Sequence, residues 1–336
     1  MVVIKGVIMG MACTYSQKQV TPFVKSLLST GFTGDVHIGM DVASKEVPWF
    51  DRHGIRHHPE PCQEQLKGAQ KKRKGKKGAV VWLGTLNQRR WHYYKEWLAA
   101  GDYNAVWLID IRDVVFQAPP FVTMPPELVL YVDKPELTDF QKAKIVHCLP
   151  KGTWEEMVAT KMPNLCGGTV MGTKAGISDM CDYMSQLHEE AEKLDGQICT
   201  RNDQHLLNYY SFKHNVTRVG GNNGGKHMVY AKYEGAAINS GTPCDAKYHM
   251  LDKCNFKDRP CVLVNKDKVP FSIIHKWDRC GDLRMMVEHS SDGTGLYQGY
   301  SEAKFPPKRV KTPLHGAGPT PAPAPTPWPL RPGEGT

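Results

Sequence analysis

The sequence predicts an α/β protein with a mostly parallel central sheet flanked by helices. The chain opens with a strand, a helix and a second strand joined by short connections, which together form a βαβ unit with parallel strands. Residues 105–109 form an uninterrupted apolar run, which is typical of a strand covered on both faces. The chain has 336 residues, of which 40% are hydrophobic, and this is enough for a full buried core.

The opening βαβ unit can be placed along the chain. An apolar strand spans residues 2–9, and a second strand spans residues 35–40. The helix between them is predicted to begin at Thr21 as N-cap, with Pro22 at its first position. Because the two strands are parallel, the turn at residues 12–16 should lie at the ligand-binding edge of the sheet.

The remaining elements follow from hydrophobic periodicity and from turn and capping residues. The first are a short helix and a strand within residues 46–58, a helix over 87–98 whose aromatic residues face the core, and a strand over 128–132. A short helix opened by a capping box at 153–156, a glycine-rich strand over 165–172 and an amphipathic helix over 178–194 follow. The last are a helix beginning near Asp203 and short strands over 262–264 and 271–274.

Two segments stand apart from the folded domain, which is predicted to span residues 1–290. Residues 67–78 carry a run of Lys and Arg with no apolar period, so we expect a mobile basic loop that is either solvated or in contact with a polyanion. Residues 291–336 include the Pro-rich stretch that begins at 306, and we expect a disordered tail there. The net charge of +9 is concentrated in the basic loop and in residues 304–311, so no nucleic-acid partner is expected.

The ten cysteines show no zinc-binding spacing. Six of them are scattered as in a reducing compartment: Cys13, Cys62, Cys148, Cys166, Cys181 and Cys199. The other four, Cys244, Cys254, Cys261 and Cys280, could form two disulfides or a metal knot in a lumenal protein, but free thiols are the favoured interpretation. No apolar stretch reaches the ~18 to 20 residues of a membrane span, and no signal-peptide pattern is present. We therefore expect a cytoplasmic protein without a membrane span.

Two carboxylates follow the buried strand at residues 105–109. Asp110 and Asp113 would leave the sheet at the carboxyl end of that strand, where they can either cap the turn or bind one hard cation. His275 ends a later apolar strand, and a lone histidine in such a place is usually structural. Two carboxylates and one imidazole together suit Mn²⁺ or Mg²⁺, and the imidazole favours Mn²⁺.

Four segments in order carry a family resemblance. Residues 109–121, which include Asp110, Arg112 and Asp113, resemble the Asp-x-Asp element of GT-A nucleotide-sugar glycosyltransferases. Residues 166–173, 202–208 and 273–279 resemble that superfamily's glycine-rich strand, its Asp-Gln helix start and its late histidine motif. Cys166 stands where the family usually has Asn, and Lys276 where it usually has Gln. The resemblance implies a GT-A (Rossmann-like) fold over residues 1–290.

The resemblance also implies roles for single residues. Asp203 would address the acceptor hydroxyl, as the base in an inverting enzyme or as an orienting group in a retaining one. Mn²⁺ (or Mg²⁺) would be the cofactor, a nucleotide-sugar the donor, and a glycan or glycoconjugate the acceptor. The implied metal ligands are Asp110, Asp113 and His275, and the implied donor contacts are Tyr15, Arg90, Asp110, Gly168 and Lys276.

Two other classes of function remain open from the sequence. A metal-dependent nucleotidyltransferase would also use paired Asp residues, but it should carry a glycine-rich triphosphate loop, which residues 6–11 hardly provide. A non-catalytic polyanion-binding module would use the run from Lys71 to Lys77. Its binding would depend strongly on salt and would survive chelation of metals.

Overall fold

The structure is a computed structural model that describes most of the first 279 residues and a few isolated positions. The described residues are 3–41, 45–62, 86–139, 142, 146, 149–195, 203–218, 226–230, 237–239, 263, 270–279, 284 and 287. The predicted basic loop at 67–78, the predicted tail at 291–336, and Cys148, Cys199, Cys244, Cys254, Cys261 and Cys280 lie outside them.

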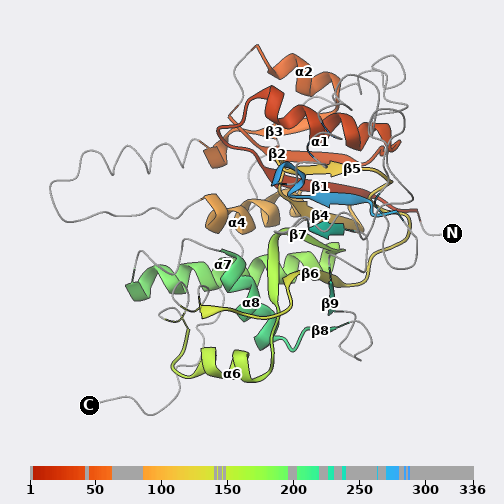
Figure 1. Ribbon diagram of the computed structural model, residues 1–336. Coiled ribbons are helices and arrows are strands. Elements are labelled where there is room, and N and C mark those ends of the chain that lie inside the picture. Colours follow the sequence, from red (N-terminus) through yellow and green to blue (C-terminus); the bar gives the residue numbers. More distant parts are fainter. Residues whose placement is uncertain are drawn as a thin grey trace.

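The described chain forms an α/β fold around a mixed sheet of eight strands (Figure 1). Neighbouring strands are parallel except at β7, which is antiparallel to both β4 and β6. The prediction of a mostly parallel sheet is therefore confirmed, with one reversed strand at its centre. In spatial order the strands are β3 (Ile55–His58), β2 (Asp35–Gly39), β1 (Gly6–Met11), β4 (Ala105–Ile109), β7 (Asn164–Thr173), β6 (Leu128–Lys134), β9 (Lys226–Tyr230) and β8 (Thr217–Arg218).

Strand β4 shows why the sheet is apolar on both faces. Val106 and Leu108 belong to the core cluster that includes α4 (Leu86–Ala99), α7 (Lys174–Asp195) and α8 (Asp203–Lys213). Trp107 and Ile109 belong to the opposite cluster, which includes α1 (Gln17–Ser29) and part of a second, three-stranded sheet. Since successive side chains of a strand point to opposite faces, a strand covered on both sides must be apolar throughout.

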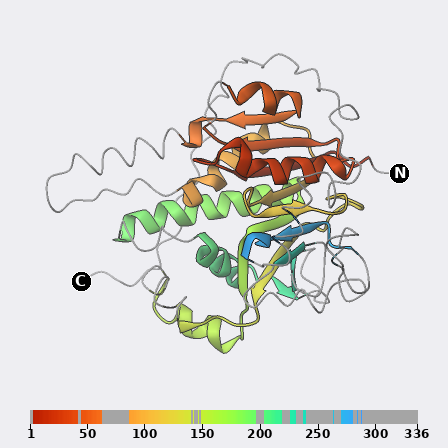
Figure 2. The same cartoon turned by 45° about the horizontal axis from the view of Figure 1, so that its top comes forward.

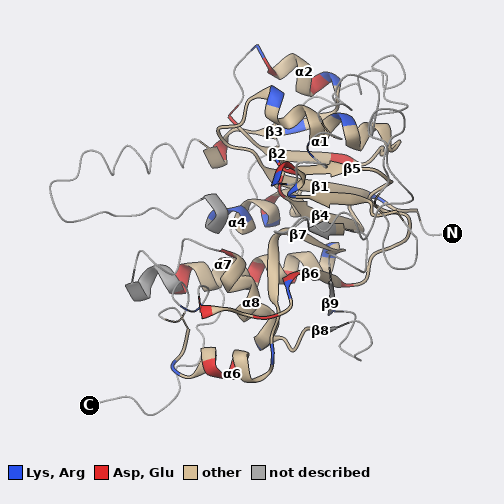
Figure 3. Cartoon of the chain, viewed as in Figure 1, with Lys and Arg blue, Asp and Glu red and all other residues tan. Residues whose placement is uncertain are grey.

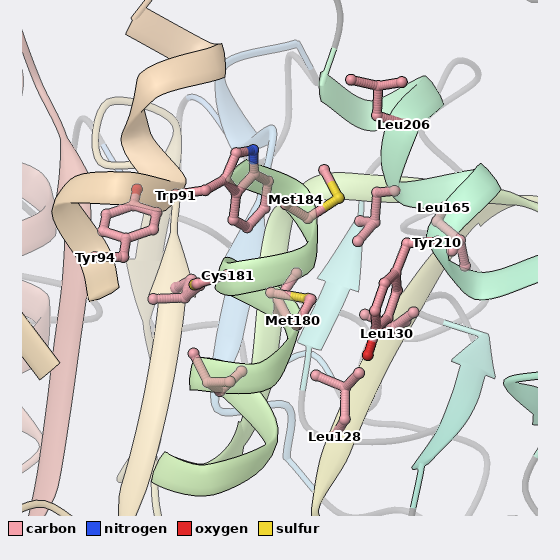
Figure 4. Packing of buried hydrophobic residues seen from close by; sticks show 14 of the residues in the cluster. Trp91, Tyr94, Leu128, Leu130, Leu165, Met180, Cys181, Met184, Leu206 and Tyr210 are labelled. Carbon is pink, nitrogen blue, oxygen red and sulfur yellow. The ribbon is translucent and has the colours of Figure 1, made fainter. Parts of the chain in front are cut away.

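Helix α7 lies between α4 and α8 on the face of the sheet to which Val106 and Leu108 point. Figures 1 and 2 show α4 and α7 side by side, in agreement with their close contact. Figure 4 shows Met180 and Met184 of α7 packed among side chains from α4, α8 and the sheet, with Trp91 and Tyr94 on the α4 side. Burying each large apolar side chain stabilises the fold by about 1.5 to 3 kcal/mol. The aromatic residues of α4 are thus core residues, as predicted.

The second sheet is small but brings distant parts of the chain together. It contains β10 (Ala237–Asn239), β11 (Ile273–His275) and β5 (Val114–Phe116), in that order. Strand β11 is antiparallel to β5, and His275 is the register partner of Val114. A short 3₁₀ helix, η4 (Trp277–Arg279), follows β11. The late part of the chain therefore returns to the turn that follows β4.

The predicted start of α1 is wrong by five residues. The helix begins at Gln17 after the N-cap Ser16, whose amide donates to Gln19 Oε1 at 2.9 Å. Thr21 lies inside the helix, where its hydroxyl donates to the Gln17 carbonyl at 2.8 Å. Ser16 and Gln19 satisfy a free N–H at the helix start, and this local pair outweighs the signal of Thr21 and Pro22.

Helix α6 (Thr153–Ala159) also begins differently from the prediction. Its N-cap is Gly152 in the left-handed region, with φ 86°, and Thr153 is already helical and buried. A glycine adopts that conformation without steric strain. Helix α2 (Val47–Arg52) and β3, in contrast, form where the sequence predicts a short helix and a strand.

Two of the cysteines that were expected to be free form a disulfide. Cys13, in the turn after β1, is bonded to Cys62, in the segment after β3, with 5.2 Å between their Cα atoms. Because β1, β2 and β3 are parallel neighbours, the segments that follow them meet at one edge of the sheet. This pairing removes the support that scattered thiols gave to a reducing compartment. Cys166 and Cys181 are free and buried.

Among the described residues, no helix is both long enough and apolar enough to cross a bilayer.

Candidate functional site

The two predicted carboxylates lie in the turn that joins β4 to β5. Asp110 follows the last residue of β4, and its amide donates to the Gly168 carbonyl of β7 at 2.9 Å. Asp113 precedes β5, and its carbonyl accepts a 2.7 Å hydrogen bond from the amide of Lys276. The turn is thus held by main-chain bonds from both sheets, and both side chains stay at the carboxyl edge of β4.

His275 reaches the same turn through the pairing of β11 with β5. Its Nε2 lies 3.4 Å from Asp110 Oδ2 and 3.6 Å from Asp113 Oδ1. One ligand atom from each of the three residues lies within 4.8 Å of the others. The predicted convergence of Asp110, Asp113 and His275 is therefore present in the fold. Two carboxylate oxygens and one imidazole nitrogen fit a divalent cation such as Mn²⁺.

Gly168 provides the space in which these side chains meet. A Cβ at this position would overlap the Asp110 carboxylate and would lie 2.7 Å from His275 Cε1. A contact below 3.0 Å forces a shift, so any larger residue would displace the carboxylate or the imidazole. The glycine signal in β7 therefore has a cause in this structure: close approach of two potential metal-ligand side chains.

The charges of the cluster support one another. Burial opposes ionisation of both carboxylates, but the hydrogen bond and positive charge of His275 hold the pKa of Asp110 and of Asp113 below the usual value. Burial likewise opposes the charged imidazole, yet Cys166 and the two carboxylates raise the pKa of His275 well above its usual value. The two carboxylates thus favour a positive charge at this position, which a bound cation would supply in place of the proton on Nε2.

Arg90 joins this cluster to Asp203. Its Nη1 lies 3.2 Å from Asp110 Oδ1, its Nη2 donates to the Gly167 carbonyl at 2.6 Å, and it forms an ion pair with Asp203. Burial raises the pKa of Asp203 to about 6, even though Arg90 acts in the opposite direction. A carboxyl group with a pKa near neutrality is suited to proton transfer. Both residues were predicted from the sequence, and the structure brings them together beside Asp110.

The rim of the site contains further charged pairs. Lys276 Nζ binds Asp133 Oδ1 at 2.8 Å, and both side chains are largely buried. Lys276 itself has a left-handed backbone with φ 62°, which turns the chain directly after His275. Arg279 pairs with Asp113 at 3.5 Å. Lys276 therefore lies beside the Asp110 cluster, with its ammonium group paired with the Asp133 carboxylate.

Tyr15 reaches the rim through Arg112. The guanidinium of Arg112 lies over the Tyr15 ring, 5.8 Å from its centroid, and binds Asp278 at 3.1 Å. The turn that carries Tyr15 follows β1 at the same edge of the sheet as Asp110. All residues with predicted site roles are thus gathered at one edge: Tyr15, Arg90, Asp110, Asp113, Gly168, Asp203, His275 and Lys276.

Sequence reasoning missed two members of this arrangement. Asp133 lies near the end of β6, and β6 runs in the same direction as β4 because both are antiparallel to β7. An aspartate after an apolar strand was the signal used for Asp110, and it could also have identified Asp133. Arg112, which lies between Asp110 and Asp113 in the sequence, binds Asp278.

A separate pocket of about 420 Å³ lies beside the C-terminal end of α8. Its described lining includes Val132, Met162, Ser211, Val216 and Met228. No carboxylate or imidazole is among the described residues that line it. It therefore does not compete with the Asp110 cluster as a metal site.

Charged residues are interspersed over the described elements (Figure 3), and both α2 and α4 carry acidic as well as basic residues. The run from Lys71 to Lys77 lies outside the described residues, so the polyanion-binding alternative stays a prediction.

No protein-family model matches the chain, and a search of curated proteins found no match. The geometry of the cluster is therefore the main support for a function.

Proposed function

We propose that this protein is a metal-dependent glycosyltransferase that moves a sugar from a nucleotide-diphosphate sugar to the hydroxyl of a glycan or glycoconjugate. The observation that carries the proposal is the convergence of Asp110, Asp113 and His275, with ligand atoms within 4.8 Å of one another. Their place at the carboxyl edge of a mostly parallel sheet supports it, because α/β folds bind ligands at that edge.

The chemistry of donor cleavage explains why such a site is needed. A nucleotide-sugar already holds an activated glycosyl group, so the main demand is to stabilise negative charge on the departing nucleoside diphosphate. When bound, a divalent cation neutralises that charge as a Lewis acid. Asp110, Asp113 and His275 would hold the cation, and the imidazole makes Mn²⁺ the favoured metal over Mg²⁺.

The acceptor side of the reaction is assigned to Asp203. Its carboxyl group is buried, paired with Arg90 and separated from Asp110 by that one guanidinium. Asp203 would take the proton of the attacking hydroxyl in an inverting reaction, or orient the acceptor in a retaining one. Arg90 would keep Asp110 and Asp203 at a fixed separation by pairing with both. The donor would then lie on the Asp110 side of this guanidinium and the acceptor on the Asp203 side.

The donor side is assigned to residues around the rim. Tyr15 would offer an aromatic face for a base, in the place where the Arg112 guanidinium lies in this structure. Lys276 and Arg279 would add positive charge near the diphosphate, since their ion pairs with Asp133 and Asp113 place both side chains at the rim of the site. The order of the four family-like segments along the chain agrees with these assignments.

Donor hydrolysis tests the proposal. The full chain, with its disulfide intact, is incubated with UDP- and GDP-sugars and Mn²⁺, and release of free sugar is measured. At least one donor should be hydrolysed, and both a chelator and Asp113→Ala should abolish the reaction. Asp102→Asn is the matched control, because that carboxylate is 88% exposed and its ion pair with Lys5 is on the surface. Failure of every donor, or hydrolysis that survives chelation, would contradict the proposal.

A further inference from the structure

The second ring nitrogen of His275 contacts two side chains of β7. Its Nδ1 lies 3.2 Å from Thr169 Oγ1 and 3.4 Å from Cys166 Sγ, while the Thr169 hydroxyl donates to Cys166 Sγ at 3.4 Å. All three residues are at most 1% exposed. The three side chains thus form a buried triangle on the side of the imidazole that does not face the carboxylates.

This triangle determines which nitrogen can bind a metal. A neutral imidazole binds a cation through the nitrogen that carries a lone pair, and the other nitrogen then carries the proton. In this site Nε2 faces Asp110 and Asp113, so a cation bound between them requires the proton to be on Nδ1. The Thr169 hydroxyl donates to Cys166 Sγ, and its oxygen lies where it can accept from Nδ1–H, which gives the direction Nδ1–H to Oγ1, and Oγ1–H to Sγ.

An irregularity in β7 explains how both side chains reach the same ring. Residues three apart on a regular strand point to opposite faces. Leu130 of β6 pairs with Val170 of β7, and Val132 of β6 pairs with Leu165 of β7. Two residues along β6 are therefore matched by five along β7. Cys166 and Thr169 both lie in this bulged part, and bulges are common next to active sites because they redirect side chains.

We infer that Cys166 and Thr169 are positioning residues of the metal site, which hold the proton on His275 Nδ1 and thereby direct Nε2 toward Asp110 and Asp113. The inference rests on the metal site of the proposed function. It does not depend on the sugar donor or on catalysis. It also gives a role to the cysteine that stands where the resembling family usually has Asn.

Mn²⁺ affinity of the full chain provides the first test. Thr169→Val removes the acceptor from Nδ1, and the double variant Thr169→Val/Cys166→Ala removes both. We expect the double variant to bind Mn²⁺ about 10- to 100-fold more weakly, the range that is typical when a partner of a ligating histidine is lost. Thr169→Ser keeps the hydroxyl and should retain the wild-type affinity. Cys181→Ala is the matched control, because it removes a buried free thiol that lies outside the triangle.

The tautomer of His275 tests directly whether Nε2 is the nitrogen that faces the cation. In ¹⁵N-labelled wild-type protein saturated with Mg²⁺, which is diamagnetic, His275 should show a protonated Nδ1 and an unprotonated Nε2. This measurement needs no variant, so it stands even if the double variant does not fold. A proton on Nε2 would overturn the inference.

The outcomes separate the inference from the proposed function. If the wild type binds Mn²⁺ but hydrolyses no donor, the proposed function fails and the inference stands on the affinities of the variants. A folded double variant that binds Mn²⁺ as tightly as the wild type would overturn the inference. A loss of Mn²⁺ affinity in Cys181→Ala equal to that of the double variant would also overturn it. A wild type that binds no divalent cation would overturn both.

Discussion

Arg90 and Asp203 form a buried ion pair in which each side chain is only 7% exposed. The same guanidinium also binds Asp110, so one side chain compensates two carboxylates from different elements. Arg90→Leu should destabilise the protein by about 3 to 5 kcal/mol, because it leaves buried charge without a partner. The free energy of unfolding in urea measures this loss.

A double variant distinguishes this pairing from simple packing. Arg90→Leu/Asp203→Leu should lose less stability than the sum of the two single variants, since it removes both members of the pair. Strictly additive losses would show that Arg90 and Asp203 contribute independently.

Gly168→Ala should disrupt the metal cluster without changing any of its ligands. The new Cβ would overlap the Asp110 carboxylate and approach His275 Cε1 to 2.7 Å, so the ligand atoms would have to separate. We expect a loss of Mn²⁺ affinity of at least about tenfold, which corresponds to about 1.4 kcal/mol. Gly167→Ala is the comparison, because its nearest contact would be 3.2 Å from the end of the Arg90 side chain. Equal affinities of both variants would contradict the role of Gly168.

The stability of the fold should fall in mild acid because of His37. Burial, followed by the charges of His58 and Arg56, lowers the pKa of His37 to about 3, and its ring bonds His58 Nε2 at 3.1 Å and the Tyr103 hydroxyl at 3.0 Å. The unfolded chain takes up a proton near pH 6.5, whereas the folded protein does not. This contribution is therefore present above pH 6.5 and is lost as the pH falls toward 3, with a slope of up to about 1.4 kcal/mol per pH unit.

Urea unfolding at a series of pH values measures that slope. His37→Gln should reduce the slope between pH 6.5 and 4 without abolishing it, because burial also lowers the pKa of His58 to about 4 and that of His188 to about 3. His92→Gln should leave the slope unchanged, since the His92 side chain is 61% exposed. A wild-type stability that stays constant over this range would contradict the account of His37.

Reduction of the Cys13–Cys62 disulfide should lower the melting temperature. The two cysteines are 49 residues apart, and the loop-entropy model gives about 4 kcal/mol for a loop of this size. Reductant should lower the Tm of the wild type more than that of Cys13→Ser/Cys62→Ser, which has no such bond to lose. Equal shifts in both proteins would show that this disulfide does not stabilise the fold.

The apolar strand that ends at Asp110 was predictable because period and composition are local signals. The parallel start of the sheet, the aromatic core of α4 and the place of Asp203 at a helix start were visible for the same reason. The approach of His275 was expected only from the family resemblance, because the pairing of β11 with β5 joins segments that no local pattern connects.

The wrong or missing predictions concern features that depend on contacts, and local sequence patterns do not show which contacts form. The start of α1 depends on a side-chain bond between Ser16 and Gln19, which competes with the equally plausible signal of Thr21 and Pro22. The disulfide depends on the spatial order of β1, β2 and β3, which sequence spacing does not express. The bulge that turns Cys166 and Thr169 toward one imidazole depends on the register between β6 and β7, which no local sequence pattern reveals.

Calorimetric titration of the full chain with Mn²⁺ tests most directly whether Asp110, Asp113 and His275 form one cation site. The wild type should bind one Mn²⁺, both Asp113→Ala and His275→Ala should lose this binding, and Asp102→Asn should keep it. Binding in His275→Ala that equals that of the wild type, or no binding by the wild type, would contradict the central claim.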